Sequence, residues 1–146
     1  ITHEQFAGED WAKVRFVASG LARALQHLHE NAMIHGDVKP LNACRSNGMW
    51  KLIDLDCTCK FDACFGRKMP STAFAPPEAI KEFVRVGNLS EYKGDESHDM
   101  WSFGVVLYHL CTGRSLFHYN QNDELVDEDI AVLASWNKKA RRKHLE

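Results

Sequence analysis

The side chains most suited to chemistry lie between residues 35 and 56. Asp37 could orient and deprotonate a hydroxyl group, and Lys39 could neutralise the charge on a migrating phosphoryl group. Asn42 and Asp54 offer the oxygen ligands that magnesium prefers in proteins. These side chains would converge if the chain between them forms a hairpin that folds back on the preceding loop. Together they are the parts that phosphoryl transfer requires.

A helix, a loop and a hairpin are expected to position these side chains. Apolar residues recur at helical spacing from about Asp10 to Glu30, which predicts a long amphipathic helix. A glycine and a proline within residues 35–42 prevent that helix from continuing, so a structured loop follows. Strand-like runs at 42–45 and 50–53 are separated by Ser46-Asn47-Gly48, whose Asn-Gly pair suits a tight hairpin turn.

The middle of the chain predicts a long loop and two helices of different character. Residues 54–78 lack periodicity and carry several prolines, which is typical of an exposed loop used for function. Pro77 suits the first turn of a short helix that ends near Phe83. Residues 100–112 are apolar on nearly every side, so we expect a buried core helix closed by Gly113.

The last segment predicts one charged helix. Acidic residues between Asp123 and Asp129 precede basic residues between Lys138 and Lys143, which is the order that the helix dipole favours. A solvated surface helix is the simpler interpretation of this pattern. A localisation signal or a nucleic-acid-binding patch is the alternative.

Length and composition indicate a single globular domain. The chain has 146 residues, of which 45% are hydrophobic and 26% are charged. A chain of this length should bury roughly 70% of the surface of its unfolded form, enough for one core. The net charge of −2 gives no overall electrostatic case for a nucleic-acid or membrane partner. The longest apolar run, Phe103–Cys111, is far shorter than the ~20 residues that span a bilayer.

Cysteine usage indicates an intracellular, cytoplasmic protein. The five cysteines are odd in number and irregular in spacing, which is typical of reduced thiols rather than a secreted disulfide framework. Cys57 and Cys59, with Cys64 and His98, could be interpreted as a zinc site, because thiolates and imidazoles are its usual ligands. The spacing differs from that of paired Cys-x-x-Cys knuckles, so we favour free thiols.

The order of the motifs resembles that of the protein kinase superfamily. Residues 35–42, with the sequence His-Gly-Asp-Val-Lys-Pro-Leu-Asn, resemble the catalytic loop H-R-D-x-x-x-x-N, and Asp54-Leu55-Asp56 resembles D-F-G. Ala75-Pro76-Pro77-Glu78 resembles the A-P-E end of the activation segment, and residues 99–104 resemble D-x-W-S-x-G. The resemblance implies a fold that is mainly α with a small β-hairpin. Residues 1–146 would be the C-terminal lobe of a kinase domain that is α+β when intact, with the small ATP-covering lobe and the end of the large lobe outside this chain.

The same resemblance implies a role for each matched residue. Asp37 would be the catalytic base, Lys39 the lysine typical of serine/threonine-directed members, and Ser71 part of the substrate-positioning loop. Asn42 and Asp54 would bind Mg²⁺ and the nucleotide. The remaining implied positions are Cys44 beneath the adenine ring of ATP, Glu78 at the end of the activation segment, and His35 and Asp99 as structural supports.

The implied activity is transfer of the γ-phosphoryl group of Mg-ATP to serine or threonine hydroxyls of a protein substrate. A pseudokinase that serves as a protein-binding scaffold is the alternative, since Gly36 replaces the family's arginine and Asp56 replaces its glycine. A basic-tailed interaction module is a third hypothesis. Gly36 also predicts activity that does not require phosphorylation of the activation loop. No motif indicates the acceptor protein or the oligomeric state.

Overall fold

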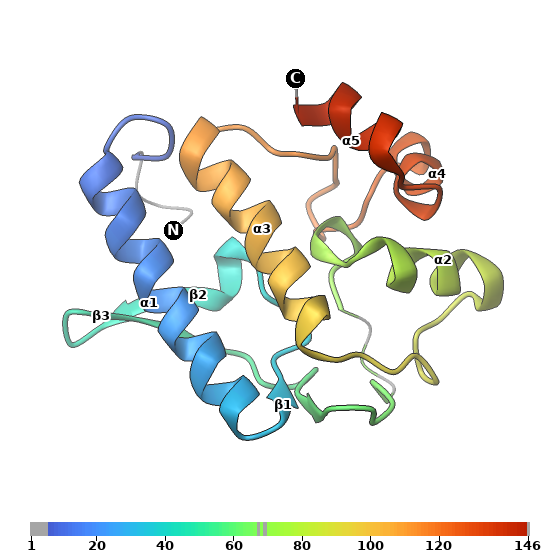
Figure 1. The fold of residues 1–146 in the computed structure, drawn as a ribbon, viewed down its shortest axis with the longest axis horizontal. Coiled ribbons are helices and arrows are strands. Elements are labelled where there is room, and N and C mark those ends of the chain that lie inside the picture. Colours follow the sequence, from blue (N-terminus) through green and yellow to red (C-terminus); the bar gives the residue numbers. More distant parts are fainter. Residues whose placement is uncertain (1–5, 67, 69, 146) are drawn as a thin grey trace.

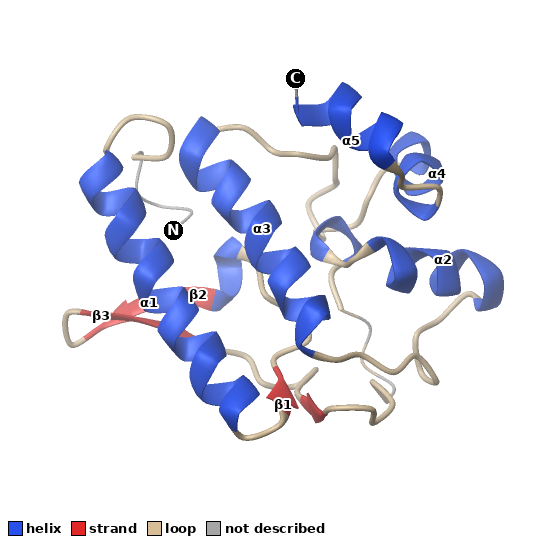
Figure 2. Cartoon of the chain, in the orientation of Figure 1, coloured by secondary structure: helices blue, strands red, loops and turns tan. Residues whose placement is uncertain are grey.

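The computed structural model describes residues 6–66, 68 and 70–145, and helices form about half of it (Figures 1 and 2). The mainly α fold class with a small hairpin is confirmed. The helices are α1 (Trp11–Glu30), α2 (Pro77–Val86), α3 (Glu96–Thr112), α4 (Asp127–Ala134) and α5 (Lys138–Leu145). The strands are β1 (Met33–Ile34), β2 (Ala43–Ser46), β3 (Met49–Leu52) and β4 (Cys59–Lys60), and short 3-10 turns cover Pro40–Asn42 and Thr72–Phe74.

Helix α1 confirms the predicted amphipathic helix. Asp10 caps its start, because the Asp10 carboxylate accepts hydrogen bonds from the backbone N–H groups of Ala12 and Lys13. The apolar stripe, which includes Val17 and Leu21, is buried in the core. This face packs against α3, and the two helices lie side by side in Figure 1.

Helix α3 is the central helix of the core, as its composition predicted, but it begins at Glu96 rather than at Met100. The Asp95 carboxylate caps the earlier start by accepting from the Ser97 N–H group. Gly113 ends the helix with a φ of 69°, the left-handed conformation expected of a C-terminal glycine. The added first turn includes Asp99, which is fully buried.

The predicted hairpin is confirmed, with a shorter turn than expected. Strands β2 and β3 pair antiparallel with Ser46 opposite Met49, so only Asn47 and Gly48 form the turn. Their φ values of 52° and 77° suit a two-residue turn that matches the twist of the strands. The hairpin packs against α1.

Residues 54–78 contain more structure than the loop prediction allowed. Strand β4 pairs antiparallel with β1, with Ile34 opposite Cys59. This pairing is long-range and leaves no periodic signature in two residues per strand. Helix α2 continues past Phe83 to Val86 and is capped by Gly87.

The prediction of one charged C-terminal helix is wrong. The segment forms α4 and α5, which are separated at residues 135–137. The Asn137 side chain accepts from the N–H groups of Lys139 and Ala140 and therefore begins a new helix. Asp123 lies before α4, not in its first turn.

Three further properties of the described residues concern membrane-spanning helices, cysteines and metal clusters. None of the helices in this part of the chain is both long and apolar enough to cross a membrane. The cysteines at positions 44, 57, 59, 64 and 111 are free. No group of three or more His, Cys, Asp or Glu side chains within residues 6–66, 68 and 70–145 could hold a metal ion.

Candidate active site

Asp99, at the start of α3, holds the backbone of residues 35–42, which we call the 35–42 loop. One Asp99 oxygen accepts from the His35 N–H group at 2.8 Å, and the other accepts from the Gly36 N–H group at 2.9 Å. The His29 ring on α1 lies 2.9 Å from the same carboxylate. Hydrogen bonds to a buried charged group are worth about 1.5–3 kcal/mol each, so this carboxylate firmly anchors the loop to the core.

His35 connects the 35–42 loop to the segment just before Asp54. Its Nδ1 accepts from the Asp37 N–H group at 3.3 Å, so its Nε2 carries the proton and donates to the Ile53 carbonyl at 3.1 Å. Burial lowers the pKa of His35 and outweighs the opposing effects of Asp99 and other carboxylates. The ring is therefore neutral and structural in this arrangement.

Asn42 joins Asp37 to the segment that carries Asp54. Its side-chain nitrogen donates to the Asp37 backbone carbonyl at 2.8 Å and to the Asp37 carboxylate at 3.1 Å. Its backbone carbonyl accepts from the Ile53 N–H group at 2.9 Å. The Asn42 side-chain nitrogen is thus engaged with Asp37, which makes the side-chain oxygen the atom that can serve a cation.

The chemistry of the Asp54 region fits a divalent cation. Lys68 places its ammonium nitrogen 2.9 Å and 3.2 Å from the Asp54 oxygens and 3.1 Å from Asp56. A cationic side chain therefore already occupies this carboxylate pair, and its hydrogen bonds lower the pKa of Asp54. Asn42 and Asp54 supply hard oxygen ligands, and magnesium needs only one or two carboxylates besides water and phosphate oxygens.

Lys39 lies at the centre of a cluster of polar side chains. Its Nζ atom donates to the Ser71 Oγ atom at 2.6 Å and lies 3.0 Å from the Asp123 carboxylate and 3.5 Å from the Asp37 carboxylate. The Ser71 N–H group donates to the other Asp37 oxygen at 2.8 Å. Burial alone would lower the pKa of Lys39, but Asp37 and Asp123 outweigh burial and raise it. Lys39 is therefore a fixed, fully charged ammonium group.

Gly36 has no space for a side chain. Its φ is 82°, and a Cβ atom there would lie 2.6 Å from the Cys57 carbonyl oxygen and 3.0 Å from the Phe65 ring. The Phe65 ring packs against His98, with ring centroids 4.8 Å apart, and against Tyr92 at 5.3 Å. An aromatic cluster therefore occupies the neighbourhood of the position where the family's arginine was expected.

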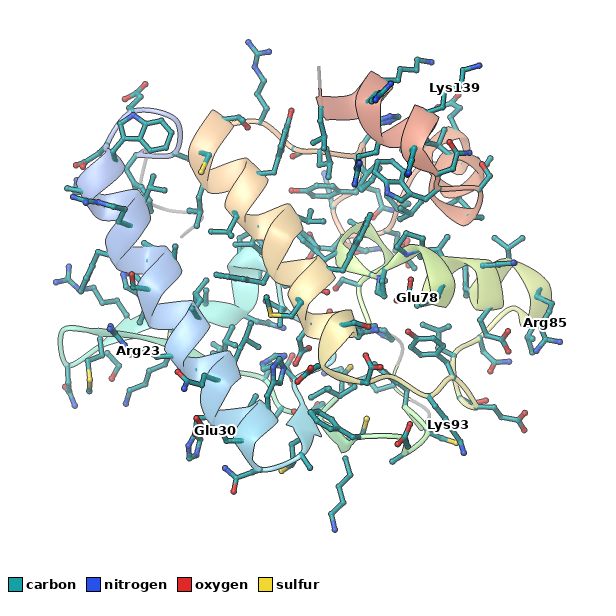
Figure 3. The ribbon with its side chains drawn as sticks, in the orientation of Figure 1. Arg23, Glu30, Glu78, Arg85, Lys93 and Lys139 are labelled. Atoms are coloured by element: carbon teal, nitrogen blue, oxygen red, sulfur yellow. The ribbon has the colours of Figure 1, made fainter. Side chains whose placement is uncertain are left out.

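The structure brings most of the predicted site residues together, but not all of them. Hydrogen bonds or ion pairs form one network of the site residues His35, Asp37, Lys39, Asn42, Ser71 and Asp99. Ile53 joins this network through its hydrogen bond to Asn42, and Asp54 is the next residue in the chain. Cys44 lies outside this network, half-buried on β2. Glu78 is exposed near the start of α2, with Arg85 at the far end of that helix (Figure 3). Among the described residues Glu78 forms no salt bridge.

Sequence reasoning missed two charged residues in this region. The charge pattern places Asp123 among the acids of a helix start, and no pattern singles out Lys68 within an irregular loop. The turn-forming composition of Asn120-Gln121-Asn122-Asp123 could have indicated a tight turn at Asp123. Nothing local indicates the partner of either residue, because Asp123 meets a lysine from a distant segment and Lys68 meets Asp54 only through the path of an irregular loop.

Comparison with known families agrees with this geometry. The sequence pattern of the protein kinase domain matches residues 2–145. The chain belongs to the protein kinase domain family. Its 35–42 loop, Asp54 and Asp99 are thus parts of a kinase domain.

Individual kinases are similar at modest identity. Protein kinase C-like 1 of Caenorhabditis elegans is 35% identical over 125 residues, which cover 85% of this chain and 17% of that protein. Serine/threonine-protein kinase TIO of Arabidopsis thaliana is 34% identical over 112 residues, which cover 74% of this chain and 8% of that protein. The kinase PK-1 of Cydia pomonella granulovirus shares the fold, with a TM-score of 0.63 and 22% identity over 91% of this chain and 49% of that one. The chain thus spans about half or less of each relative.

Proposed function

We propose that this chain is the acceptor-binding part of a protein kinase. The whole protein would transfer the γ-phosphoryl group of Mg-ATP to serine or threonine hydroxyls of protein substrates. The observation that carries the proposal is the joining of Asp37, Lys39 and Ser71 by contacts of 2.6 Å, 2.8 Å and 3.5 Å. A similar relative named as a serine/threonine-protein kinase supports the choice of acceptor.

The proposed chemistry uses Asp37 and Lys39 in different ways. As the acceptor oxygen bonds to the γ-phosphorus and the bond to the ADP oxygen breaks, the hydroxyl proton passes to the Asp37 carboxylate. Hydrogen bonds from Asn42 and Ser71 hold that carboxylate in one orientation. The ammonium of Lys39 would neutralise charge on the moving phosphoryl group. Magnesium bound by Asn42 and Asp54 would supply further neutralisation of phosphate charge.

Phosphotransfer from labelled Mg-ATP by the whole protein tests the proposal. Asp37→Asn should lower incorporation by about 10²–10⁴-fold, because it removes the proton acceptor and leaves the shape of the side chain. Asp127→Asn, at an exposed aspartate in the first turn of α4, is the matched control and should leave the rate unchanged. Equal rates for Asp37→Asn and wild type would show that Asp37 is not the base.

A pseudokinase scaffold is the second candidate. The observation that favours it is the position of Lys68, whose ammonium occupies Asp54 and Asp56. In that case the folded whole protein would transfer no phosphate, and Mg-ATP would not raise its melting temperature. Incorporation that is lost in Asp37→Asn would exclude this candidate.

We also propose that activity does not depend on a phosphate in the activation loop. Gly36 carries no cation, and Phe65, His98 and Tyr92 pack together beside it. Packing of these rings can hold the loop without a phosphate–arginine pair. Phosphatase treatment of the whole protein should therefore leave phosphotransfer within about twofold of the untreated rate, whereas a loss of most activity would contradict this.

The proposed setting is the cytoplasm, with ATP and a protein substrate as partners and without a nucleic acid or a membrane. One feature could contradict this setting: the exposed lysines and arginines of α5. Lys139 is one of them and projects outward in Figure 3. Salt-sensitive binding to an acidic partner that Lys138→Gln and Arg141→Gln abolish would support an interaction module instead.

A further inference from the structure

Asp123 is a buried acid that contacts the proposed catalytic lysine from a distant part of the chain. Only 8% of Asp123 is exposed, and its carboxylate lies 3.0 Å from the Lys39 ammonium. Lys39 is closer to Asp123 than to Asp37, which lies at 3.5 Å. A buried carboxylate is costly unless it is paired, so this ion pair accounts for the placement of Asp123.

A tight hairpin presents Asp123 to Lys39. The Asn120 N–H group donates to the Glu124 carbonyl at 2.9 Å, and Tyr119 and Leu125 form a β-bridge. The Val126 N–H group donates to the His118 carbonyl at 3.1 Å and closes the base of residues 118–126, which we call the 118–126 hairpin. Asp123 has a φ of 59° at its tip, a conformation that Asp and Asn tolerate better than most residues.

The 118–126 hairpin is also fastened to the segment that carries Ser71. The Asp123 backbone carbonyl accepts from the Ala73 N–H group at 3.1 Å. The Thr72 hydroxyl accepts from the Leu125 N–H group at 2.9 Å. The same segment begins with Ser71, whose N–H group donates to Asp37. One hairpin therefore contacts both the lysine and the backbone beside the proposed base.

We propose that Asp123 is a positioning residue that holds Lys39 beside Asp37 and keeps it from pairing tightly with that carboxylate. The inference rests on the proposed function. Lysine has a long, flexible side chain, and without Asp123 its ammonium would move toward the remaining carboxylate. A direct Lys39–Asp37 ion pair would occupy the Asp37 oxygen that the acceptor hydroxyl needs to approach. Asp123 thus leaves Asp37 free to accept the acceptor proton while Lys39 stays charged and fixed.

The kinetic test is a double-mutant cycle in the whole protein. Asparagine has the size of aspartate and also tolerates a positive φ, so Asp123→Asn removes only the charge. This variant should have a kcat about 10- to 100-fold lower, with little change in the KM for ATP. In a Lys39→Met background the same substitution should cause no further loss, because its effect passes through Lys39. The matched control Asp127→Asn should change neither constant. If the kcat of the double variant falls by the product of the two single-variant losses, the inference is overturned.

A second measurement does not depend on activity. Acetic anhydride labels uncharged, accessible amines, and mass spectrometry reports the rate at each lysine. Asp123→Asn should increase labelling of Lys39 several-fold and leave exposed Lys81 unchanged, since Asp123 is one of the two carboxylates that raise the pKa of Lys39 and its loss increases the uncharged fraction of the amine. Equal Lys39 labelling in wild type and Asp123→Asn would overturn the inference.

These measurements separate the inference from the proposed function. If wild type transfers no phosphate, the proposed function fails, and Lys39 labelling alone decides whether Asp123 holds the lysine. If Asp123→Asn does not fold, as judged by thermal unfolding, wild type supplies the test. Lys39 should then label more slowly than Lys81, and equal rates would overturn the inference.

Discussion

At the scale of single residues, the site depends on unusual backbone conformations as well as on side chains. Gly36 and Asp54 both have positive φ values, of 82° and 63°. For Asp54 this conformation costs about 1 kcal/mol or more, and the surrounding contacts must supply that energy. The contacts around it include the Lys68–Asp54 ion pair and the His35–Ile53 hydrogen bond.

Gly36→Ala should destabilise the protein by about 2–5 kcal/mol, the sum of a left-handed backbone penalty and overpacking against Cys57 and Phe65. Gly87→Ala is the matched control, because Gly87 has the same φ of 82° and nothing within 4 Å of an added Cβ atom. It should cost only about 1–2 kcal/mol. Urea unfolding measures both, and equal losses would show that the space beside Gly36 is not limiting.

Lys68→Gln should strengthen divalent cation binding at Asp54 by about threefold, because it removes a competing positive charge from exposed carboxylates. It should also raise the pKa of Asp54, since the hydrogen bond from Lys68 lowers it. Lys60→Gln removes an exposed lysine on β4 and controls for net charge. Mn²⁺ titration followed by electron paramagnetic resonance gives the affinity, and an unchanged affinity would contradict competition.

At the scale of elements, the close approach of Gly20 on α1 to Trp50 on β3 determines how the hairpin packs against α1. A Cβ atom at Gly20 would lie 2.6 Å from the Trp50 Cβ atom, which cannot move without shifting β3. The opposite case is Gly104 in α3, where an added Cβ atom would have nothing within 4 Å. The packing thus requires a glycine at position 20 and does not require one at position 104.

Gly20→Ala should lower the unfolding free energy by about 1–3 kcal/mol, because overpacking outweighs the better helix propensity of alanine. Gly104→Ala should raise it by up to about 1 kcal/mol, since only the propensity changes. Chemical denaturation compares the two variants. A stabilised Gly20→Ala protein would mean that the hairpin can move away from α1 at little cost.

At the scale of the whole molecule, stability should depend on pH through buried histidines. Burial lowers the pKa of His35 and of His98, and the His98 Nδ1 atom is buried without a hydrogen-bond partner among the described residues. Below about pH 6.5 the unfolded chain binds protons that the folded chain does not, so stability is full above that pH and falls as the pH drops. The slope should be up to about 1.4 kcal/mol per pH unit for each histidine.

His98→Gln should flatten this slope between about pH 6.5 and pH 5, whereas His27→Gln, at an exposed position on α1, should not. Urea unfolding at a series of pH values measures the slope. A flat profile from pH 7 down to pH 5 would contradict the buried neutral state of these histidines.

At high pH the raised pKa of Cys57, about 11, predicts a second decline of stability above about pH 9, because only the unfolded thiol then ionises.

Local signals in the sequence determined most of the elements and grouped most of the candidate site residues. Helix α1, the Asn47-Gly48 turn and the Gly113 cap each follow from residues within a few positions of one another. The motif spacing likewise identified Asp37, Lys39 and Asn42 as a chemical unit, because one short loop carries them. The start of α3 and the break before α5 were misjudged, since in each case a single capping side chain, Asp95 or Asn137, changed the boundary.

Only the tertiary structure decided which distant groups meet. The Lys39–Asp123 pair joins segments far apart in the chain, the Lys68–Asp54 pair joins two positions of one irregular loop, and the packing beside Gly36 depends on Phe65. Ion pairs and close packing of this kind leave no periodic pattern, because they depend on how the elements are arranged in space rather than on neighbours in sequence. Motifs therefore predict the residues of the candidate site. The charged residues that contact them, Asp123 at Lys39 and Lys68 at Asp54, are determined by the folded arrangement.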